Sequence, residues 1–206
     1  MDVAHPYKAV CPTLDGDVLM ALAGSKMGMT GRQVAALTGR SSHSGVLNVL
    51  NRLTEQGVVD RVELNRAYLF SLNRDHLAYP AVIALLGLRI ALIGGVQETI
   101  KTWKLPPIHG SLFGSFARGD GDAHSDIDLF LVRPAAASEE DDIWREQLDE
   151  LALTITRSTG NQASIHEVSE SELPRLRTDP PPIVAQLRSD AIHLSGPLIS
   201  ALLGSE

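Results

Sequence analysis

The chain has 206 residues, of which 44% are hydrophobic, and it carries a formal net charge of −7. This length suits one or two domains that can each bury a core. The single cysteine, Cys11, excludes an internal disulfide and a cysteine-based zinc site. The first five residues lack the basic and apolar regions of a signal peptide, so we expect a cytoplasmic protein.

Charge is distributed unevenly between the two halves of the sequence. Residues 1–104 contain 11 Lys and Arg against 8 Asp and Glu, whereas residues 105–206 contain 7 against 17. A basic half followed by an acidic half predicts two domains with different partners.

Three helices followed by two strands are predicted in the first part of the chain. Apolar residues at helical spacing indicate the first helix, and Thr30 with Gln33 fits a capping box at the start of the second. Gly57 ends the third helix, and two strand-like runs then flank Asn65 and Arg66. The helices are expected at residues 14–23, 30–39 and 40–57, and the strands at 58–64 and 67–72.

This order of elements resembles a winged helix-turn-helix. The stretch T-G-R-Q-V-A-A-L-T-G-R-S-S-H-S-G-V-L-N-V-L-N-R-L-T-E-Q-G-V-V is similar to MarR-type winged-helix families, and the resemblance covers residues 12–76. It implies that the third helix enters the DNA major groove, while the hairpin contacts the backbone or the minor groove. The side chains then expected to contact DNA are Ser42, His43, Ser44, Asn48, Asn51 and Arg52 on the third helix, and Arg61 and Arg66 on the hairpin.

A second interpretation of this first part stays open. Winged helices also serve as protein-docking or dimerisation modules, and a net charge of +3 over residues 1–104 is small for a DNA-binding domain. The assignment to DNA therefore depends on the motif and not on charge.

Residues 80–96 are apolar on nearly every side. The run is shorter than the ~20 residues that a membrane-spanning helix needs, and it contains Arg89, so we expect no membrane segment. Pro80 suits the first turn of a helix, and a helix that is apolar all round requires burial. We therefore predict a connector helix within residues 79–105, with residues 80–103 packing on both domains or on a second copy in a homodimer. Burial within one chain is the alternative.

Residues 109–132 contain two polar motifs that lie close together. Gly114-Ser115 follows a short apolar run, and Asp126-Ile127-Asp128 opens another. The second run reads as a strand, so Asp126 and Asp128 point the same way, about 7 Å apart. Two carboxylates at this spacing are costly to keep ionised without a cation. Mg²⁺ or Mn²⁺ would offset that cost and leave room for phosphates, which the glycine and the N–H groups of a helix start favour.

The same stretch resembles the minimal nucleotidyltransferase domain of the DNA polymerase β superfamily. The resemblance is carried by G-S-F-A-R-G-D-x-x-x-x-S-D-I-D-L and extends from about residue 107 to the C-terminus. It implies that Gly114 and Ser115 hold the triphosphate of an NTP, and that Asp126 and Asp128 hold Mg²⁺. The implied reaction transfers a nucleoside monophosphate from NTP to an acceptor hydroxyl and releases pyrophosphate.

Arg118 and Ser125 are the other residues expected to bind the nucleotide. Arg118 follows the glycine-serine motif closely, where it can neutralise charge on the leaving phosphates. A surface ion pair with Asp120 or Asp122 is an equally weighted alternative.

The third carboxylate of that superfamily has no plain counterpart in this sequence. Residues 162–168 read as a strand, and the positions expected to face the metal are Ser164 and His166. Glu167 has the opposite parity, so only a bulge or a strand end would turn it toward the metal. His166 is a candidate metal ligand or base, although a lone strand histidine is more often structural. The expected catalytic set is Asp126, Asp128 and Glu167.

Helices and short strands complete the second half. Ser138 is expected to cap a helix that opens with acidic residues and runs to Gly160. Residues 182–190 read as a further helix and residues 191–194 as a strand.

These patterns predict an α+β protein in three segments. They are a winged helix-turn-helix at 1–78, a connector helix at 79–105 and an α/β nucleotidyltransferase domain with a small mixed sheet at 106–206. The expected function is that of a DNA-binding protein that also transfers nucleotides. A transcription regulator whose second domain binds nucleotide without turning it over is one alternative, and a toxin–antitoxin component is another.

Overall fold

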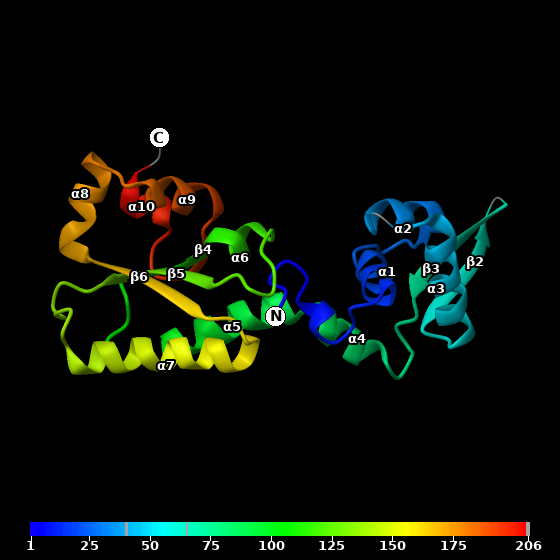
Figure 1. Cartoon of the computed structure of the whole chain (residues 1–206), viewed down its shortest axis with the longest axis horizontal. Coiled ribbons are helices and arrows are strands. Elements are labelled where there is room, and N and C mark those ends of the chain that lie inside the picture. Colours follow the sequence, from blue (N-terminus) through cyan, green and yellow to red (C-terminus); the bar gives the residue numbers. More distant parts are fainter. Residues whose placement is uncertain (40, 65, 205–206) are drawn as a thin grey trace. The chain divides into compact units, whose positions relative to one another are not determined.

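The computed structural model describes residues 1–39, 41–64 and 66–204 (Figure 1). The chain divides into two compact units, which we call the N-terminal unit (residues 7–88) and the C-terminal unit (residues 1–6 with 89–206). The division therefore falls inside the predicted connector, and the first six residues pack with the second half of the chain instead of the first.

The N-terminal unit contains the three helices and the hairpin that the sequence predicts. Its core is made by side chains from all three helices and both long strands, among them Val18, Val34, Leu50, Val59 and Phe70. The elements are η1 (Pro6–Ala9), α1 (Leu14–Ala23), β1 (Met29–Thr30), α2 (Gly31–Leu37), α3 (His43–Glu55), β2 (Val59–Leu64), β3 (Ala67–Leu72) and α4 (Tyr79–Leu86).

Local sequence explains where these helices begin. Thr30 and Gln33 form the predicted capping box, in which the Thr30 hydroxyl accepts from Gln33 N and Gln33 Oε1 accepts from Thr30 N. Ser42 caps α3 and accepts a hydrogen bond from Gly45 N. Arg40, where the third helix was expected to begin, lies outside the described residues.

The sheet of the N-terminal unit has the strand order β1-β3-β2 and is antiparallel throughout. The hairpin of β2 and β3 pairs Val59 with Leu72 and Leu64 with Ala67. Phe70, at the centre of β3, is buried in the core, whereas nearly all of β2 is exposed.

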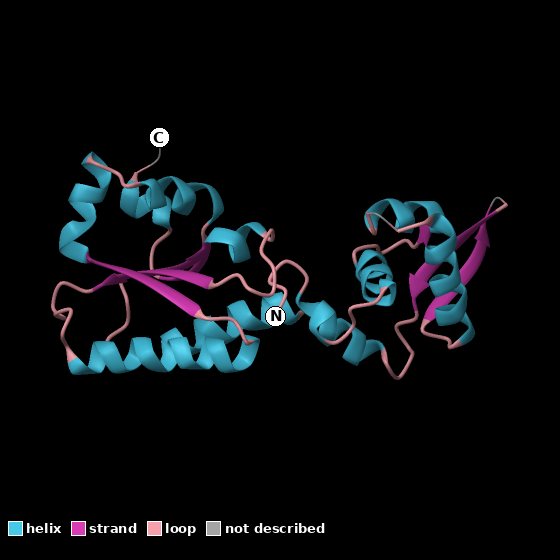
Figure 2. Cartoon of the chain, in the orientation of Figure 1, coloured by secondary structure: helices cyan, strands magenta, loops and turns pink. Residues whose placement is uncertain are grey.

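The C-terminal unit is built on a four-stranded mixed sheet of order β6-β5-β4-β7 (Figure 2). β5 and β6 are parallel, and the other two pairs are antiparallel, which confirms the predicted small mixed sheet. The elements are α5 (Leu88–Lys101), β4 (His109–Phe113), α6 (Gly114–Arg118), β5 (Ile127–Arg133), α7 (Asp142–Thr159), β6 (Ala163–Ser169), η2 (Glu170–Glu172), α8 (Leu173–Thr178), α9 (Pro182–Asp190), β7 (Ile192–Ser195) and α10 (Ile199–Leu203).

Alternation along β5 gives this sheet two buried faces. Leu129 and Leu131 face α5 and α7, while Phe130 and Val132 face α8, α9 and α10. Figure 1 shows these two sets of helices on opposite sides of the sheet. Because both faces are covered, β5 reads in the sequence as a continuous apolar run, interrupted only by Asp128 near its start.

The connector predicted as one helix consists of two. α4 ends at Gly87, whose N–H bonds to Ile83 O, and α5 starts at Leu88. Arg89 explains the charge within the apolar run, because its Nη2 donates to Ala117 O at the end of α6 (2.8 Å) and its guanidinium lies over the Phe116 ring.

Among the described residues no single helix is long and apolar enough to cross a membrane. The pair α4 and α5, separated by the break at Gly87, reaches the necessary length and composition only when the two are counted together. Within the C-terminal unit, Ile90 on α5 is 75% exposed, and how the connector packs on a partner stays a prediction.

The start of α7 differs from the prediction. Asp141, not Ser138, is the N-cap, and its carboxylate accepts from the N–H groups of Ile143 and Trp144. A carboxylate at this position meets the positive end of the helix as well as two unpaired donors, so it competes well with the earlier serine.

Candidate active site

A close contact between Gly114 and Asp128 lies at the centre of the candidate site. β4 ends at Phe113, which pairs with Asp128 on β5, and the chain then turns into the short helix α6. Gly114 has φ +68°, and a Cβ on it would lie 2.3 Å from Asp128 Oδ2. Only glycine suits this position, because any side chain would be strained and would displace the carboxylate.

Asp126 and Asp128 are brought together as the sequence predicts. Asp128 is half-buried on β5, whereas Asp126 is exposed and immediately precedes the strand. Burial raises the pKa of the Asp128 carboxyl, the nearby charges of His166 and Arg118 lower it, and the charge of Asp126 raises it. The pair therefore combines one desolvated and one exposed carboxylate, a combination that favours a bound cation.

The loop between α6 and β5 packs tightly around Gly121. A Cβ there would lie 2.8 Å from Ser115 Oγ and 2.9 Å from Ser125 Oγ, so the two predicted serine side chains face the same loop residue. Asp122 closes a turn, since its Oδ1 accepts from His124 N (2.8 Å) and from Ser125 Oγ (3.2 Å). The hydrogen bond from His124 N is the main cause of the lowered pKa of Asp122.

Arg118 is held by two carboxylates. Its Nε donates to Asp120 Oδ2 (2.9 Å) and its Nη1 to Asp190 Oδ2 at the end of α9 (3.2 Å). The ion pair with Asp120 is one of the alternatives that the sequence left open, and Asp190 was not foreseen. Arg118 would have to leave or share these partners in order to contact a phosphate.

The expectation that a bulge or a strand end turns Glu167 toward the metal is wrong. β5 and β6 pair one to one from Ile127 with Ala163 to Arg133 with Ser169, so the register keeps Glu167 on the face of α7, opposite Asp128. There Glu167 Oε2 accepts from Trp144 Nε1 (2.5 Å), and Oε1 lies 3.7 Å from Arg133 Nε. Glu167 is thus part of a packed network beneath the sheet.

Ser164 and His166 lie on the face of Asp128, as strand parity predicts. Ser164 pairs directly with Asp128, and its Oγ lies 3.4 Å from His166 Nε2. The His166 ring also packs edge-on against Phe113 (5.5 Å between centroids). Among the described residues no group of three His, Cys, Asp or Glu side chains is arranged to hold a metal. Two carboxylates nevertheless fit Mg²⁺, which proteins often bind through one or two carboxylates together with substrate phosphates and water.

The side chains predicted to contact DNA are exposed, and several of them have partners. Arg52 forms an ion pair with Asp15 on α1, and the Arg61 guanidinium lies 4.9 Å from the centre of the Tyr68 ring. Arg66 adopts φ +67° at the hairpin turn. Ser42 is the N-cap of α3, and its Oγ lies 3.2 Å from Ser44 Oγ in the first turn. His43 also lies in the first turn, and Asn48 lies nearer the middle of the helix.

Two residues near the site were missed by sequence reasoning. Asn161 and Val3 are buried against the loop that leads to Asp126. Asn161 is a polar residue between a helix-ending glycine and a strand, which is a weak sequence signal of a structural role. No feature of the sequence indicates such a role for Val3.

Comparison with known proteins supports one part of this picture. Residues 98–177, within the C-terminal unit, match the family model described as "Nucleotidyltransferase domain". Residues 1–97 lie outside the match, and the resemblance to winged-helix families stays a prediction. No curated protein matches the chain.

One solved structure from Sulfolobus solfataricus, named a "putative nucleotidyltransferase", is similar over 51% of this chain and 80% of its own. Its sequence identity of 18% and TM-score of 0.27 are too low to support an argument about the fold.

Proposed function

We propose, from the premise that residues 98–177 form a nucleotidyltransferase domain, that the C-terminal unit transfers a nucleoside monophosphate from NTP to an acceptor hydroxyl. The observation that carries this proposal is the contact of Asp128 with Gly114, beside the exposed carboxylate of Asp126. It joins a carboxylate pair to a glycine-serine bend at the start of a short helix, which is the combination of groups that nucleotidyl transfer requires.

In this proposal Asp126 and Asp128 hold Mg²⁺ or Mn²⁺, which supplies positive charge to the triphosphate and to the attacking oxygen. Asp128 is held rigidly on a central strand, and burial makes its charge costly, so it gains most from a cation. Gly114 is buried against Asp128, and Ser115 and Ser125 supply hydroxyl groups close to Gly121. Arg118, paired with two carboxylates, is available to a phosphate only through exchange of partners.

His166 takes the place at which the superfamily would supply its third acid. It lies on the face of Asp128, close enough for its charge to lower the pKa of that carboxyl, and it is exposed to solvent. We infer that His166 accepts the proton of the acceptor hydroxyl. The hydroxyl oxygen attacks the α-phosphorus of the NTP at the same time, and pyrophosphate leaves. A histidine is suited to this role near neutral pH.

The proposal is tested with labelled NTPs and Mg²⁺ in the presence of protein, RNA and small hydroxyl acceptors. Label should be transferred by the wild type, and the Asp126→Asn and Asp128→Asn variants should transfer none. An absence of transfer by the wild type across all four NTPs and these acceptors would contradict the proposal. Nucleotide binding without transfer would instead favour the alternative of a regulatory nucleotide sensor, which the displaced Glu167 makes worth testing.

For the N-terminal unit we propose DNA binding through α3 and the β2–β3 hairpin. It is supported by the exposed polar side chains of α3, which include His43 and Asn48. A side chain that pairs with a base edge contributes about 1–3 kcal/mol, so Asn48→Ala should weaken the shift of a fragment from the protein's own promoter 5- to 150-fold, approximately. Arg52→Ala should have a smaller effect, because Arg52 is engaged by Asp15. The matched control is Gln56→Ala at the far end of α3, and equal shifts by all variants would contradict the placement.

A further inference from the structure

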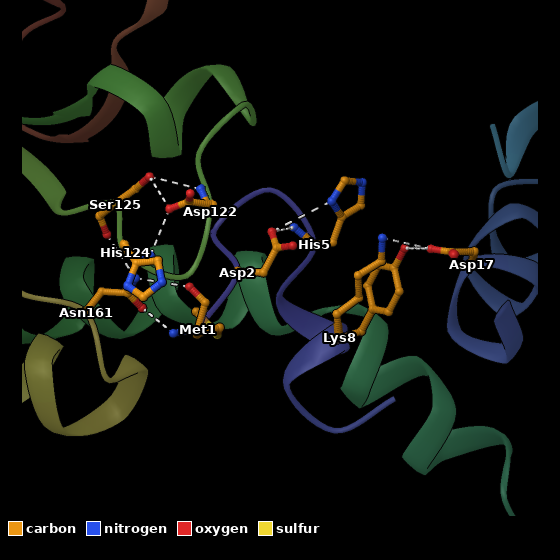
Figure 3. Close-up of polar contacts among 10 residues, drawn as sticks. Met1, Asp2, His5, Lys8, Asp17, Asp122, His124, Ser125 and Asn161 are labelled. Carbon is orange, nitrogen blue, oxygen red and sulfur yellow. Dashed lines mark hydrogen bonds and ion pairs between the residues drawn. The ribbon is translucent and has the colours of Figure 1, made fainter. Parts of the chain in front are cut away.

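Asn161 is almost completely buried beside the loop that carries Asp126. It follows the last turn of α7 and Gly160, and only 3% of its surface is exposed. Its Nδ2 donates to Ser125 O (2.9 Å) and lies 3.3 Å from Ala123 O. The same nitrogen donates to Met1 O (3.0 Å), while Oδ1 accepts from the amino group of Met1 (2.8 Å; Figure 3).

One amide group therefore bonds to two carbonyl groups of the loop and to the first residue of the chain. Two N–H hydrogens of Asn161 serve three carbonyl oxygens, so no other residue type of this size could satisfy them equally. A buried carbonyl left without a donor costs about 1–3 kcal/mol. The loop is thus tied to α7 immediately before Asp126, since Ser125 is the preceding residue.

The residue after Asp126 is tied to the same segment. Ile127 N donates to Gln162 O (2.8 Å), next to Asn161 in the chain. Asp126 is consequently held between two hydrogen bonds, one from the Asn161 side chain to Ser125 and one from Ile127 to Gln162. Its own side chain remains exposed.

Val3 closes the other side of the loop. It is fully buried in the core beneath the sheet, and its N–H bonds to Asp122 O (3.4 Å). A Cβ on Gly121 would lie 2.4 Å from Val3 Cγ2, so the loop is packed closely from this side as well.

We propose that Asn161 is a positioning residue for Asp126, which holds the loop so that the exposed carboxylate meets the divalent cation at Asp128. The inference builds on the proposed function, because it takes these two carboxylates as the metal site. The chemistry it needs is that of a neutral amide. An aspartate in its place would have no hydrogen to donate when ionised and would set a negative charge against carbonyl oxygens.

The experiment compares the full-length wild type with Asn161→Asp and Asn161→Ala. The matched control is Gln147→Glu, since Gln147 is also a buried amide on α7 that bonds to backbone, through Nε2 to Leu105 O (3.0 Å) and Oε1 to Leu105 N (3.1 Å). Gln147 lies in the N-terminal half of α7, whereas Asn161 follows the C-terminal end of that helix.

Two readouts separate positioning from general stability. Binding of Mn²⁺ alone is followed by the electron paramagnetic resonance signal of the free ion, and amide hydrogen exchange is followed over residues 122–127. Loss of a residue that orients a metal ligand typically weakens metal affinity about 10- to 100-fold. We expect this loss, with faster exchange in the loop, in both Asn161 variants but not in the Gln147 control.

Folded Asn161 variants that bind Mn²⁺ as tightly as the wild type would overturn the inference, as would a wild type that binds no Mn²⁺. If neither variant folds, exchange in the wild type decides. Slow exchange at Asp122 and Ile127 supports a held loop, and exchange as fast as in an unfolded chain refutes it. A wild type that shows the Asn161-dependent Mn²⁺ binding yet transfers no nucleotide would refute the proposed function alone.

Discussion

Gly114, at the start of α6, lies against Asp128 on β5, so that a methyl group on the glycine would lie 2.3 Å from the aspartate Oδ2. Gly114→Ala should therefore lower nucleotidyl transfer by about 100-fold, the loss expected when a reacting group is displaced by ~1 Å. The left-handed backbone adds about 1–2 kcal/mol of destabilisation. Rates and urea unfolding measured on the same preparation check both numbers.

Gly204→Ala is the control for the backbone term alone. Gly204 has φ +77°, and a Cβ on it would contact nothing within 4 Å. It should lose similar stability and keep its activity. Equal losses of activity in both variants would mean that strain, and not the contact with Asp128, explains the effect.

Asp128 should destabilise the unliganded fold at neutral pH. Burial raises its pKa above that of the unfolded chain, so the folded state binds more protons between the two values, and stability falls as pH rises through that window. Asp128→Asn should remove this fall and unfold at a higher temperature than the wild type at pH 7, while losing activity.

Thermal unfolding from pH 3 to pH 7, with and without Mg²⁺, measures this effect. Mg²⁺ should stabilise the wild type more than the Asn variant, because it offsets a charge that the variant lacks. A variant that is less stable than the wild type at pH 7 without Mg²⁺ would show that the Asp128 carboxylate is already compensated by protein groups.

Glu167→Gln should affect stability and leave catalysis nearly unchanged. The glutamine can still accept from Trp144 Nε1, but Arg133, which is largely buried, loses its ionic partner. We expect a loss of about 1–3 kcal/mol in the free energy of unfolding. If the Glu167→Gln variant has less than a tenth of the wild-type activity at unchanged stability, Glu167 is a catalytic residue after all.

His166→Gln should reduce kcat by about 100- to 10,000-fold if His166 accepts the proton of the acceptor hydroxyl. The KM for NTP should change little, because His166 is not among the residues proposed to bind phosphate. The pH–rate profile should also lose the limb that reports the general base. Ser164→Ala, on the same face and beside His166, serves as the control. A variant with the wild-type rate and pH profile would exclude His166 as the base.

Sequence reasoning succeeded where the pattern was local. The capping box of Thr30 and Gln33 and the alternation along β5 depend on residues a few positions apart, and the structure reproduces both. The carboxylate pair was foreseen for the same reason, since Asp126 and Asp128 are separated by one residue.

The errors arose where distant residues compete. Arg118 donates a hydrogen bond to Asp190, 72 positions later, and the Asn161 side chain donates one to Ser125, 36 positions earlier. Strand parity predicts that Glu167 faces the core, whereas the resemblance predicts a third acid at the metal. The structure agrees with parity, because no bulge interrupts the pairing of Glu167 with Leu131. Ser138, Asp141 and Asp142 are all residue types that can cap a helix, and the structure uses Asp141.

Residues 1–6 belong to the C-terminal unit although the whole N-terminal unit lies between them and Arg89 in the chain. The N-terminal unit is therefore an insertion with two covalent attachments instead of a domain added at one end. A fragment that began at residue 89 would lack Val3, which packs against the loop that leads to Asp126. A study of the C-terminal unit alone should therefore delete residues 7–88 and keep residues 1–6 joined to the chain from residue 89 onward.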